Sequence, residues 1–222
     1  MKISIIIPVF NEEKTILKIL ESTQKTFTDT EFEIIIIDDG STDDTENICQ
    51  NFCQSNKNIN YEKLTKNYGK GYALRRGFAI ASGAFVAIQD ADLEYDPKNL
   101  RELYNHVQAD VVVYGKRDKK NGYFWNKVGN AALTSVCNFL YDSHLSDIYT
   151  CYKIIPNKIM PALQISANGF EIEAEITAKL LRAKIKIIEV PISYHPRTFQ
   201  EGKHIRARDG IIGIWTLIKN RF

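Results

Sequence analysis

Three acidic residues, spaced two apart, follow a short apolar segment near the middle of the chain. Residues 84–88 read Ala-Phe-Val-Ala-Ile, and Asp90, Asp92 and Glu94 come shortly after them. Because alternate side chains of an extended chain point to the same side, we expect the three carboxylates to project from one edge. Carboxylate oxygens are the ligands that hard divalent cations prefer. The spacing therefore predicts a metal site, and a solvated acidic turn is the alternative.

The apolar segment before the acids is typical of a buried β-strand, and similar segments recur along the chain. The predicted strands are residues 3–9, 32–37, 59–64, 84–88, 110–115, 154–155 and 185–190. Apolar residues at helical spacing predict helices around residues 16–20, 48–52, 74–80, 125–141, 171–181 and 205–220. Strands that alternate with helices predict an α/β fold, with a mainly parallel central sheet and helices on both faces.

Polar residues follow each of the first four predicted strands. They are Asn11 and Glu12, residues 38–39, residues 67–71 and the cluster that begins at Asp90. Ligands of parallel sheets bind where the carboxyl ends of strands meet loops, so we expect these four loops to face one crevice. The first loop lacks the glycine pattern by which dinucleotide-binding and phosphate-binding loops hold a diphosphate. An anionic ligand would then have to be held through a metal.

Turn and cap chemistry is the alternative for each of these loops. In the second loop, Ser41 or Thr42 is expected to cap the helix that follows.

The composition excludes some classes of protein. With 29 basic and 27 acidic residues among 222, the net charge is +2, which gives no support to nucleic-acid binding. The sequence contains no apolar run of the roughly 18 residues that a membrane span needs, and it opens in a strand pattern instead of a signal peptide. Its four cysteines form no Cys-x-x-Cys pair. These features predict one cytoplasmic domain with reduced cysteines.

Four motifs, in this order, resemble glycosyltransferase family 2, in its dolichyl-phosphate mannose synthase-like branch. They are residues 7–12 (IPVFNE), 37–43 (IDDGSTD), 67–71 (NYGKG) and 89–94 (QDADLE), and the likeness continues through 147–153, 169–171, 190–192 and 197–203. The resemblance implies a GT-A fold over one domain, residues 1–222. Within it, residues 1–115 would form the nucleotide-sugar-binding half, and residues 116–222 the acceptor-side half with a C-terminal amphipathic helix.

The resemblance also implies an activity. It is the inverting, metal-dependent transfer of a hexose from a nucleoside-diphosphate sugar of the GDP-mannose or UDP-glucose type, with Mg²⁺ or Mn²⁺ as the cofactor. The acceptor would be a polyprenyl or dolichyl phosphate, or a saccharide hydroxyl in surface polysaccharide or glycolipid assembly. A non-catalytic sugar-nucleotide-binding module is the alternative of another class; such a module would be expected to lose an acid from the pair Asp90 and Asp92, and both are present.

The resemblance assigns roles to individual residues. It places around the nucleotide sugar Pro8, Asn11, Glu12, Asp39, Lys70, Gly71, Gln89 and Asp90. Asp90, Asp92 and Glu94 would hold the metal, although many relatives carry glutamine in place of Glu94, and catalysis would depend on Asp92. Three basic residues match positions that face the acceptor phosphate or the leaving diphosphate: Arg117, Arg197 and Lys203. The alternative for each is a solvated surface cation.

The acceptor decides whether a base is needed. A lipid phosphate is already anionic at neutral pH, so transfer to it needs little more than positioning and charge neutralisation. A hydroxyl acceptor requires a carboxylate that takes its proton. Asp147 is the first candidate for that base, and a structural acid that binds backbone amides is the alternative. Glu171 and Glu173 are the second candidates, although acids also favour the start of a helix for electrostatic reasons.

The last predicted helix carries Ile211, Ile212, Trp215 and Ile218 near one face. Such a stripe either docks on a membrane surface or packs on its own domain. The protein is therefore expected in the cytoplasm, with peripheral attachment to the cytoplasmic face of the membrane as one possibility. It would meet a lipid phosphate there directly or through a membrane protein partner, or use a soluble acceptor.

Overall fold

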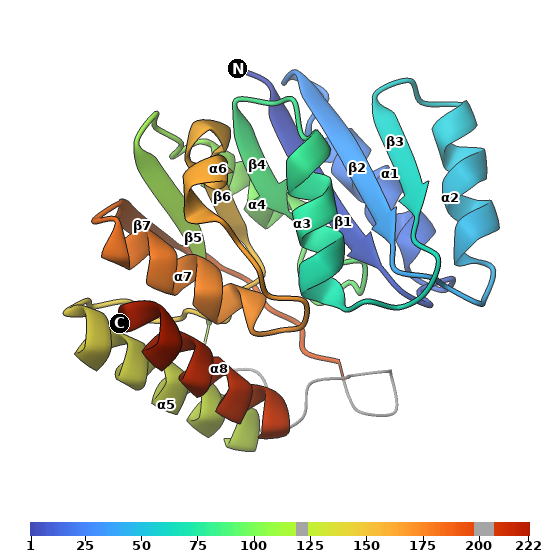
Figure 1. Cartoon of the computed structure of the whole chain (residues 1–222). Helices are drawn as coiled ribbons and strands as arrows, with labels where there is room; N and C mark the ends of the chain where they lie inside the picture. The colour runs from blue at the N-terminus through green and yellow to red at the C-terminus, as the bar shows by residue number, and fades with distance from the viewer. Residues whose placement is uncertain (119–123, 198–206) are drawn as a thin grey trace.

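The structure, a computed structural model, describes residues 1–118, 124–197 and 207–222. Its centre is a sheet of order β3-β2-β1-β4-β6-β5-β7 (Figure 1). The strands are β1 (Ile3–Val9), β2 (Phe32–Asp38), β3 (Ile59–Lys63), β4 (Phe85–Ile88), β5 (Val111–Arg117), β6 (Lys153–Pro156) and β7 (Lys186–Ile192). Neighbouring strands are parallel, except that β6 runs antiparallel to both β4 and β5. The prediction of a mainly parallel sheet is confirmed.

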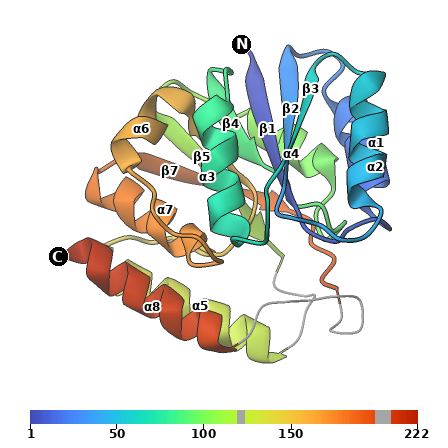
Figure 2. The same cartoon turned by 45° about the vertical axis from the view of Figure 1, so that its right-hand side comes forward.

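Helices cover both faces of the sheet, as predicted. They are α1 (Ile16–Thr26), α2 (Thr45–Gln54), α3 (Lys70–Ile80), α4 (Pro97–Tyr104), α5 (Phe124–Tyr141), α6 (Met160–Leu163), α7 (Ile172–Arg182) and α8 (Ala207–Arg221), with a 3₁₀ turn, η1 (Asn157–Ile159), before α6. Figures 1 and 2 show α3, α6 and α7 on one face and α1 and α4 on the other. Helices α5 and α8 lie side by side outside the sheet and pack against α7.

The core follows from the continuous apolar strands. Ile5, Ile6 and Ile7 of β1 are fully buried, and so are residues 34–37 of β2. Consecutive side chains of a strand point to opposite faces, so a run that is buried throughout must be covered by helices on both sides. This single sheet continues across residue 115, which lies inside β5. The two predicted halves therefore share one core.

Helix α7 connects this core to the outer helices. Ile172, Ile176 and Leu180 belong to the main core, whereas Ala174 and Ala178 belong to a smaller cluster with α5 and α8. Small alanine side chains on the second face allow the outer pair to approach closely. Helices α5 and α8 are thus attached to the sheet through α7.

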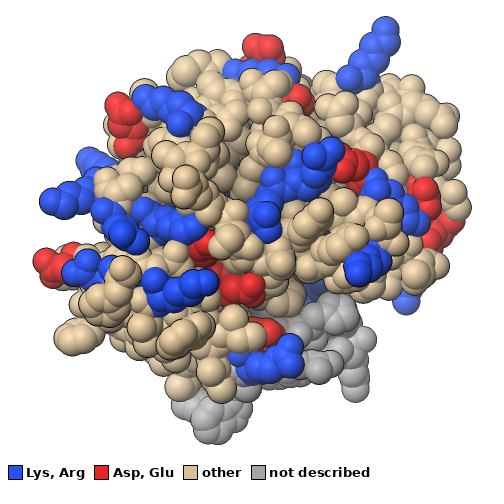
Figure 3. All heavy atoms as spheres, viewed as in Figure 1, with Lys and Arg blue, Asp and Glu red and all other residues tan. Residues whose placement is uncertain are grey.

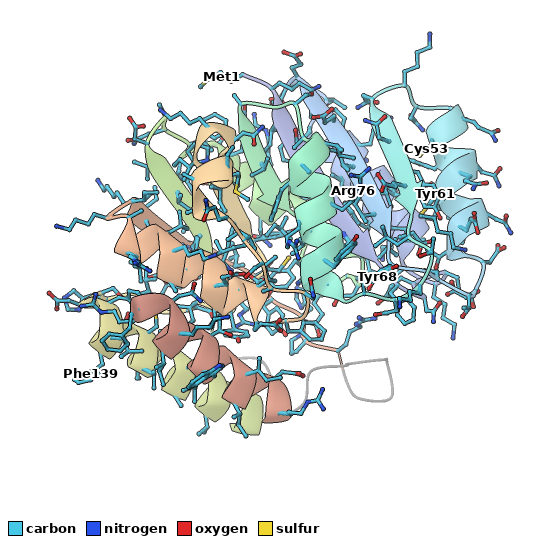
Figure 4. The ribbon with its side chains drawn as sticks, in the orientation of Figure 1. Met1, Cys53, Tyr61, Tyr68, Arg76 and Phe139 are labelled. Carbon is cyan, nitrogen blue, oxygen red and sulfur yellow. The ribbon has the colours of Figure 1, made fainter. Side chains whose placement is uncertain are left out.

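The outer helices expose large apolar side chains. Phe139 of α5 is 88% exposed, and it projects away from the rest of the protein (Figure 4). Ile211 and Trp215 of α8 are 70% and 64% exposed, whereas Leu217 is fully buried. The predicted stripe therefore lies mainly on the exposed side of α8, since Ile218 is also exposed and Ile212 is half-buried. Among the described residues, none of the helices combines the length and apolar content that crossing a bilayer would take.

Two local predictions differ from the structure. Helix α4 was not predicted, because it is short and begins at Pro97. The predicted cap of the second helix, Ser41 or Thr42, is wrong, since α2 begins at Thr45 and shows no side-chain cap hydrogen bond. The Ser41 hydroxyl instead accepts a hydrogen bond from the backbone N–H of Asn11, at 2.9 Å. Ser41 therefore joins the first and second loops instead of starting a helix.

Candidate active site

A cleft of about 380 Å³ opens at the carboxyl ends of the central strands. Residues from all four predicted loops line it: Glu12 after β1, Asp39 after β2, Lys70 at the start of α3, and Asp90 and Asp92 after β4. Pro8, inside the end of β1, lines it as well. The second half of the chain contributes Arg117, Tyr149, Cys151, Glu173, Tyr194 and Arg197. The four loops therefore meet at one crevice, as predicted from their order.

A larger hollow, of about 980 Å³, lies beside α3 near the amino end of β4. Arg75 and Arg76 line it, and none of the described residues around it is acidic. It therefore offers no carboxylate for a cation. On the face of the molecule seen in Figure 3, basic and acidic side chains are interspersed, which agrees with the balanced net charge.

Asn11 joins the first two loops and does not line the cleft. It adopts a positive φ of 53°, and its side-chain oxygen accepts a hydrogen bond from the backbone N–H of Thr42, at 2.8 Å. The next residue, Glu12, donates its backbone N–H to the hydroxyl of Thr45, at 3.0 Å. Asn11, predicted to contact the nucleotide sugar, instead supports the loop that presents Glu12.

Gln89 and Gly71, two further predicted contacts, also stand behind the cleft. Gln89 is fully buried and accepts a hydrogen bond from the hydroxyl of Tyr152, at 2.6 Å. Gly71 packs against the backbone of residues 167–169, so that an added Cβ would lie 2.7 Å from the carbonyl oxygen of Ala167. Gln89 and Gly71, predicted to contact the nucleotide sugar, thus support other residues and are not among those that line the cleft.

Asp39 anchors the third loop. Its carboxylate is almost fully buried and accepts hydrogen bonds from the backbone N–H groups of Tyr68 and Gly69, both at 2.8 Å. Burial raises the pKa of Asp39, although these two bonds oppose the change. Gly69 has a φ of +100°, and a Cβ there would lie 2.4 Å from the carbonyl oxygen of Asn168. A glycine is therefore required where this loop turns into α3.

Lys70 and Asp90 form an ion pair inside the cleft. The Nζ of Lys70 lies 2.7 Å from Oδ1 of Asp90 and 3.5 Å from Oε1 of Glu173. Burial alone would lower the pKa of Lys70, but the neighbouring negative charges, that of Asp90 above all, hold it well above its ordinary value. Lys70 thus stays charged in the cleft.

Asp92 lies among three charged residues of the cleft, Asp90, Glu94 and Arg197. Its Oδ2 accepts a hydrogen bond from Nη2 of Arg197 at 3.1 Å, and its Oδ1 accepts one from the backbone N–H of Glu94 at 3.0 Å. Burial, together with the charges of Asp90 and Glu94, raises the pKa of Asp92 to about 7. The neighbouring carboxylates thus create a negative potential that Arg197 offsets only in part.

The prediction that Glu94 shares a metal with the two aspartates is not supported. Strand β4 ends at Ile88, the chain then bends, and Leu93 has a φ of +61°, so the alternation expected of an extended chain does not hold. The two oxygens of Glu94 accept hydrogen bonds from the backbone N–H of Arg197, at 2.7 Å, and from the hydroxyl of Tyr194, at 2.8 Å. Glu94 therefore holds the segment that follows β7.

Asp90 and Asp92 still have the chemistry that a divalent cation needs. Within the described ranges, no three acidic, histidine or cysteine side chains are arranged to hold a metal ion. The two aspartates supply hard oxygen donors, and the raised pKa of Asp92 marks an excess of negative charge at that place. The pair fits a cation that takes its other ligands from an anionic substrate.

Arg197, in the segment that follows β7, contacts the loops after β1 and β4. Its guanidinium donates two hydrogen bonds to the carboxylate of Glu12, at 2.9 and 3.1 Å, besides the one to Asp92. Its Nε is buried and has no hydrogen-bond partner in the described part of the chain. Lys203, the other predicted basic residue of this region, lies outside the described residues.

Asp147 is bound to Arg117. Its oxygens accept hydrogen bonds from Nε and Nη2 of Arg117, at 2.6 and 2.9 Å, from the side chain of Asn130, at 2.9 Å, and from the backbone N–H of Tyr149, at 3.2 Å. Although burial raises it, these bonds hold the pKa of Asp147 below its ordinary value. Such a carboxylate is a poor proton acceptor, so the geometry favours the structural alternative over the predicted base.

Three aromatic or sulfur-bearing residues of the cleft were not singled out from the sequence: Tyr149, Cys151 and Tyr194. Tyr149 and Cys151 come just before β6, which is inserted antiparallel between β4 and β5, and Tyr194 follows β7. No local pattern in the sequence predicts the insertion of β6. Tyr149 also meets α8, since a Cβ on Gly213 would lie 2.1 Å from its hydroxyl. The cleft is therefore in contact with the outermost helix through one side chain.

Comparison with known proteins identifies the family. The pattern described as Glycosyl transferase family 2 matches residues 4–160, more than half of the chain. The chain belongs to glycosyl transferase family 2. It is therefore a glycosyltransferase, and the predicted family and enzyme class are confirmed.

Two relatives illustrate how far the likeness extends within family 2. An uncharacterized protein of Methanocaldococcus jannaschii is 29% identical over 86% of this chain and 87% of its own length. The dolichol-phosphate mannosyltransferase of Pyrococcus furiosus is 27% identical over 91% of this chain, which spans only 59% of that protein.

Comparison with a solved structure shows the fold of this chain. The glucosyl-3-phosphoglycerate synthase of Mycobacterium tuberculosis, crystallised with Mn²⁺, UDP and phosphoglyceric acid, superimposes with a TM-score of 0.75 at 19% identity. The alignment covers 99% of this chain and 78% of that one. This likeness confirms the GT-A fold.

Proposed function

We propose that this glycosyltransferase moves a hexose from a nucleoside-diphosphate sugar, of the GDP-mannose or UDP-glucose type, to a polyprenyl phosphate. One observation carries the proposal: a single cleft contains the carboxylates of Asp90 and Asp92 and the cationic groups of Lys70, Arg117 and Arg197. A site with both kinds of charge suits a reaction in which a cation and a diphosphate enter together and an anionic acceptor follows. The name of the Pyrococcus furiosus relative supports the class of acceptor.

The donor would occupy the side of the cleft formed by the first three loops. Pro8, Glu12 and Asp39 line that side and would surround the nucleoside, while Asn11 and Gly71 keep the loops in place from behind. Lys70 comes next to Asp90, where it would meet the phosphates. The nucleoside and the phosphates would thus lie along the edge of the sheet in the direction from β2 to β4.

Asp90 and Asp92 would hold Mg²⁺ or Mn²⁺. The bound cation would neutralise the diphosphate as it departs. The M. tuberculosis synthase, which has the same fold, was crystallised with Mn²⁺ and UDP. Arg197 would have to leave Asp92 when the cation binds, because both use the same carboxylate.

A phosphate acceptor agrees better with the site than a hydroxyl acceptor does. Arg117 and Arg197 supply cations for a phosphate, and a guanidinium binds phosphate oxygens well. Asp147, the predicted base, is bound to Arg117 and has a lowered pKa. The phosphate oxygen needs no base, so these residues would act by positioning the acceptor and by offsetting charge.

A lipid-borne acceptor also agrees with the outer helices. Large apolar side chains are exposed on both helices, Phe139 on α5 and Ile211 and Trp215 on α8, and Lys219 and Arg221 follow on α8. An apolar helix face flanked by basic residues is suited to the interface of a membrane. We propose that the protein attaches peripherally to a membrane through these two helices.

The deciding experiment measures nucleotide release. UDP-glucose, GDP-mannose and related donors are incubated with the protein, with either Mn²⁺ or EDTA, and with dolichyl phosphate or a saccharide acceptor. We expect release that requires both the metal and the lipid phosphate. Release that requires only a saccharide would favour the hydroxyl acceptor. Binding of a sugar nucleotide without release under any condition would favour the non-catalytic module.

A further inference from the structure

Three acids begin α7, and two of them hold the loop before it. Glu171 accepts hydrogen bonds from the backbone N–H groups of Asn168 and Gly169, at 3.2 and 3.0 Å. Glu175 accepts hydrogen bonds from the backbone N–H groups of Ser166 and Ala167, the shortest at 2.7 Å. The roles of these two acids are therefore structural.

The middle acid, Glu173, points elsewhere. Its side chain is 5% exposed, and its Oε2 accepts a close hydrogen bond from the ammonium group of Lys153. The side chain of Lys153 has no exposed surface, and its Nζ also donates to the backbone carbonyls of Ile148 and Thr150. A lysine buried this deeply needs a partner of opposite charge, and Glu173 supplies it, so Lys153 and Glu173 hold each other in place.

The second oxygen of Glu173 is not satisfied. Oε1 is buried, has no hydrogen-bond partner among the residues that the structure describes, and lies 3.5 Å from Nζ of Lys70. That distance is longer than a good hydrogen bond, and the ammonium group of Lys70 lies much closer to Asp90, at 2.7 Å. A buried carboxylate oxygen without a donor is costly, which indicates that a donor arrives with a ligand.

The position of Glu173 indicates which ligand that is. Glu173 lines the same cleft as Asp90 and Asp39. Along the sheet, Asp39 follows β2, Asp90 follows β4, and Lys153, the partner of Glu173, begins the next strand, β6. If the nucleoside lies near Asp39 and the diphosphate near Asp90, as the proposed function holds, the sugar comes next in this order. A carboxylate accepts hydrogen bonds only, so a phosphate cannot satisfy it but a sugar hydroxyl can.

We propose that Glu173 recognises the transferred sugar: its free oxygen accepts a hydrogen bond from one hydroxyl group of the hexose, and Lys153 is the positioning residue that holds it there. This inference rests on the proposed function and adds to it the residue that selects the sugar. A hydroxyl that donates to an ionised carboxylate makes a strong hydrogen bond. The enzyme should therefore discriminate against donors that lack that hydroxyl.

The test compares the preferred donor with its monodeoxy analogues, one for each hexose hydroxyl. For the wild-type enzyme, we expect one analogue to lose about 10- to 100-fold in kcat/KM. For Glu173→Gln, the same analogue should lose no more than about threefold relative to the full donor. Because Glu173→Gln leaves Lys153 without its counter-charge, the double variant Glu173→Gln/Lys153→Met is measured as well, and it should behave in the same way.

The matched control is Glu175→Gln, which changes a neighbouring acid of the same helix that holds the loop. Glu175→Gln should discriminate against the same deoxy analogue as strongly as the wild type does, even if the substitution lowers the stability of the protein. Lys153→Met should weaken discrimination at the same hydroxyl as Glu173→Gln, which a general loss of stability would not do.

Three results would overturn the inference. Equal discrimination in wild type and in both Glu173 variants would show that another residue selects the sugar. The inference would also fail if the wild-type enzyme lost less than about threefold in kcat/KM with every monodeoxyhexose analogue. It would fail as well if kcat/KM fell only with donors that carry a deoxyribose. Failure to turn over any sugar nucleotide would instead remove the proposed function, and this inference with it.

Discussion

The guanidinium of Arg197 lies 3.1 Å from Oδ2 of Asp92, so it occupies the carboxylate that a divalent cation would need. The same arginine holds Glu12, which is 185 residues away in the chain. Its backbone N–H is bound by Glu94, the acid that the sequence assigned to the metal. The loop after β1 and the segment after β7 therefore meet at the place where the donor is proposed to bind.

Removal of this guanidinium should strengthen the binding of a cation. We expect Arg197→Ala to bind Mg²⁺ about 3- to 10-fold more tightly than wild type, because Asp92 loses its competing partner. The measurement is isothermal titration calorimetry at pH 8.5, where Asp92 is ionised in the wild type. Arg101→Ala, which breaks a surface pair with Asp29, serves as the control and should not change the affinity. Weaker or equal Mg²⁺ binding by Arg197→Ala would contradict the competition.

Asp92 should make the stability of the cation-free protein depend on pH. Its pKa is raised from 3.8 to about 7, so between these values the folded protein retains a proton that the unfolded chain releases. The contribution of Asp92 to stability is therefore present below about pH 4 and is lost as the pH rises through 7. Relative to Asp92→Asn, we expect the free energy of unfolding of wild type to fall by about 1–3 kcal/mol between pH 4 and pH 8. Urea unfolding of both proteins in EDTA measures this difference, and parallel pH profiles would count against it.

Asp147 should act through Arg117. We expect Asp147→Asn to reduce the stability by about 3 kcal/mol, because it leaves the largely buried cation of Arg117 with a neutral partner. In a double-mutant cycle on transfer to the phosphate acceptor, Arg117→Ala/Asp147→Asn should be no slower than Arg117→Ala. A base would show itself differently. If the losses of rate in Arg117→Ala and Asp147→Asn multiplied in the double variant, and if Asp147→Asn also changed the acidic limb of the pH–rate profile, Asp147 would be a proton acceptor.

Two glycines of α8 provide a matched pair. A Cβ on Gly210 meets nothing within 4 Å, whereas a Cβ on Gly213 would lie 2.1 Å from the hydroxyl of Tyr149. Gly210→Ala should stabilise the protein by about 0.5–1 kcal/mol, the usual gain in a helix, and Gly213→Ala should destabilise it by about 1–3 kcal/mol. Thermal unfolding measures both.

A second variant tests the cause of that loss. The hydroxyl of Tyr149 has no hydrogen-bond partner in the ranges that the structure describes, so Tyr149→Phe should cost little by itself. Combined with Gly213→Ala, it should recover about 1 kcal/mol of the lost stability, because the closest contact is gone. If the combination recovers nothing, the ring itself or Leu133, and not the hydroxyl, is the obstacle.

The sequence was most informative where local patterns decide structure. Continuous β-branched runs predicted β1 and β2 almost to the residue, since such runs can only be strands buried on both faces. The loops after these strands could be placed in one cleft because parallel strands end at one edge. Helix α4 was missed because its eight residues offer only Leu100 and Leu103 as a buried pair.

The candidate site was harder to predict than the fold. The assignment of Glu94 depended on the chain staying extended beyond Ile88, but the chain bends there, and the oxygens of Glu94 are bound by Tyr194 and by the backbone of Arg197. The pairs Arg197–Glu12 and Lys153–Glu173 join segments that are distant in the sequence. No local pattern encodes such contacts, so a motif could identify these residues as important without showing what they touch.

Tyr149 lies between the cleft and α8, and its hydroxyl contacts α8 at Gly213. On that helix, Gly213 faces inward, while its neighbours Ile211 and Trp215, two residues away on either side, face outward. A helix with its side chains is about 10 Å across. Whatever settles on the outer side of α8 therefore comes to rest about one helix thickness from Tyr149, which forms part of the wall of the cleft.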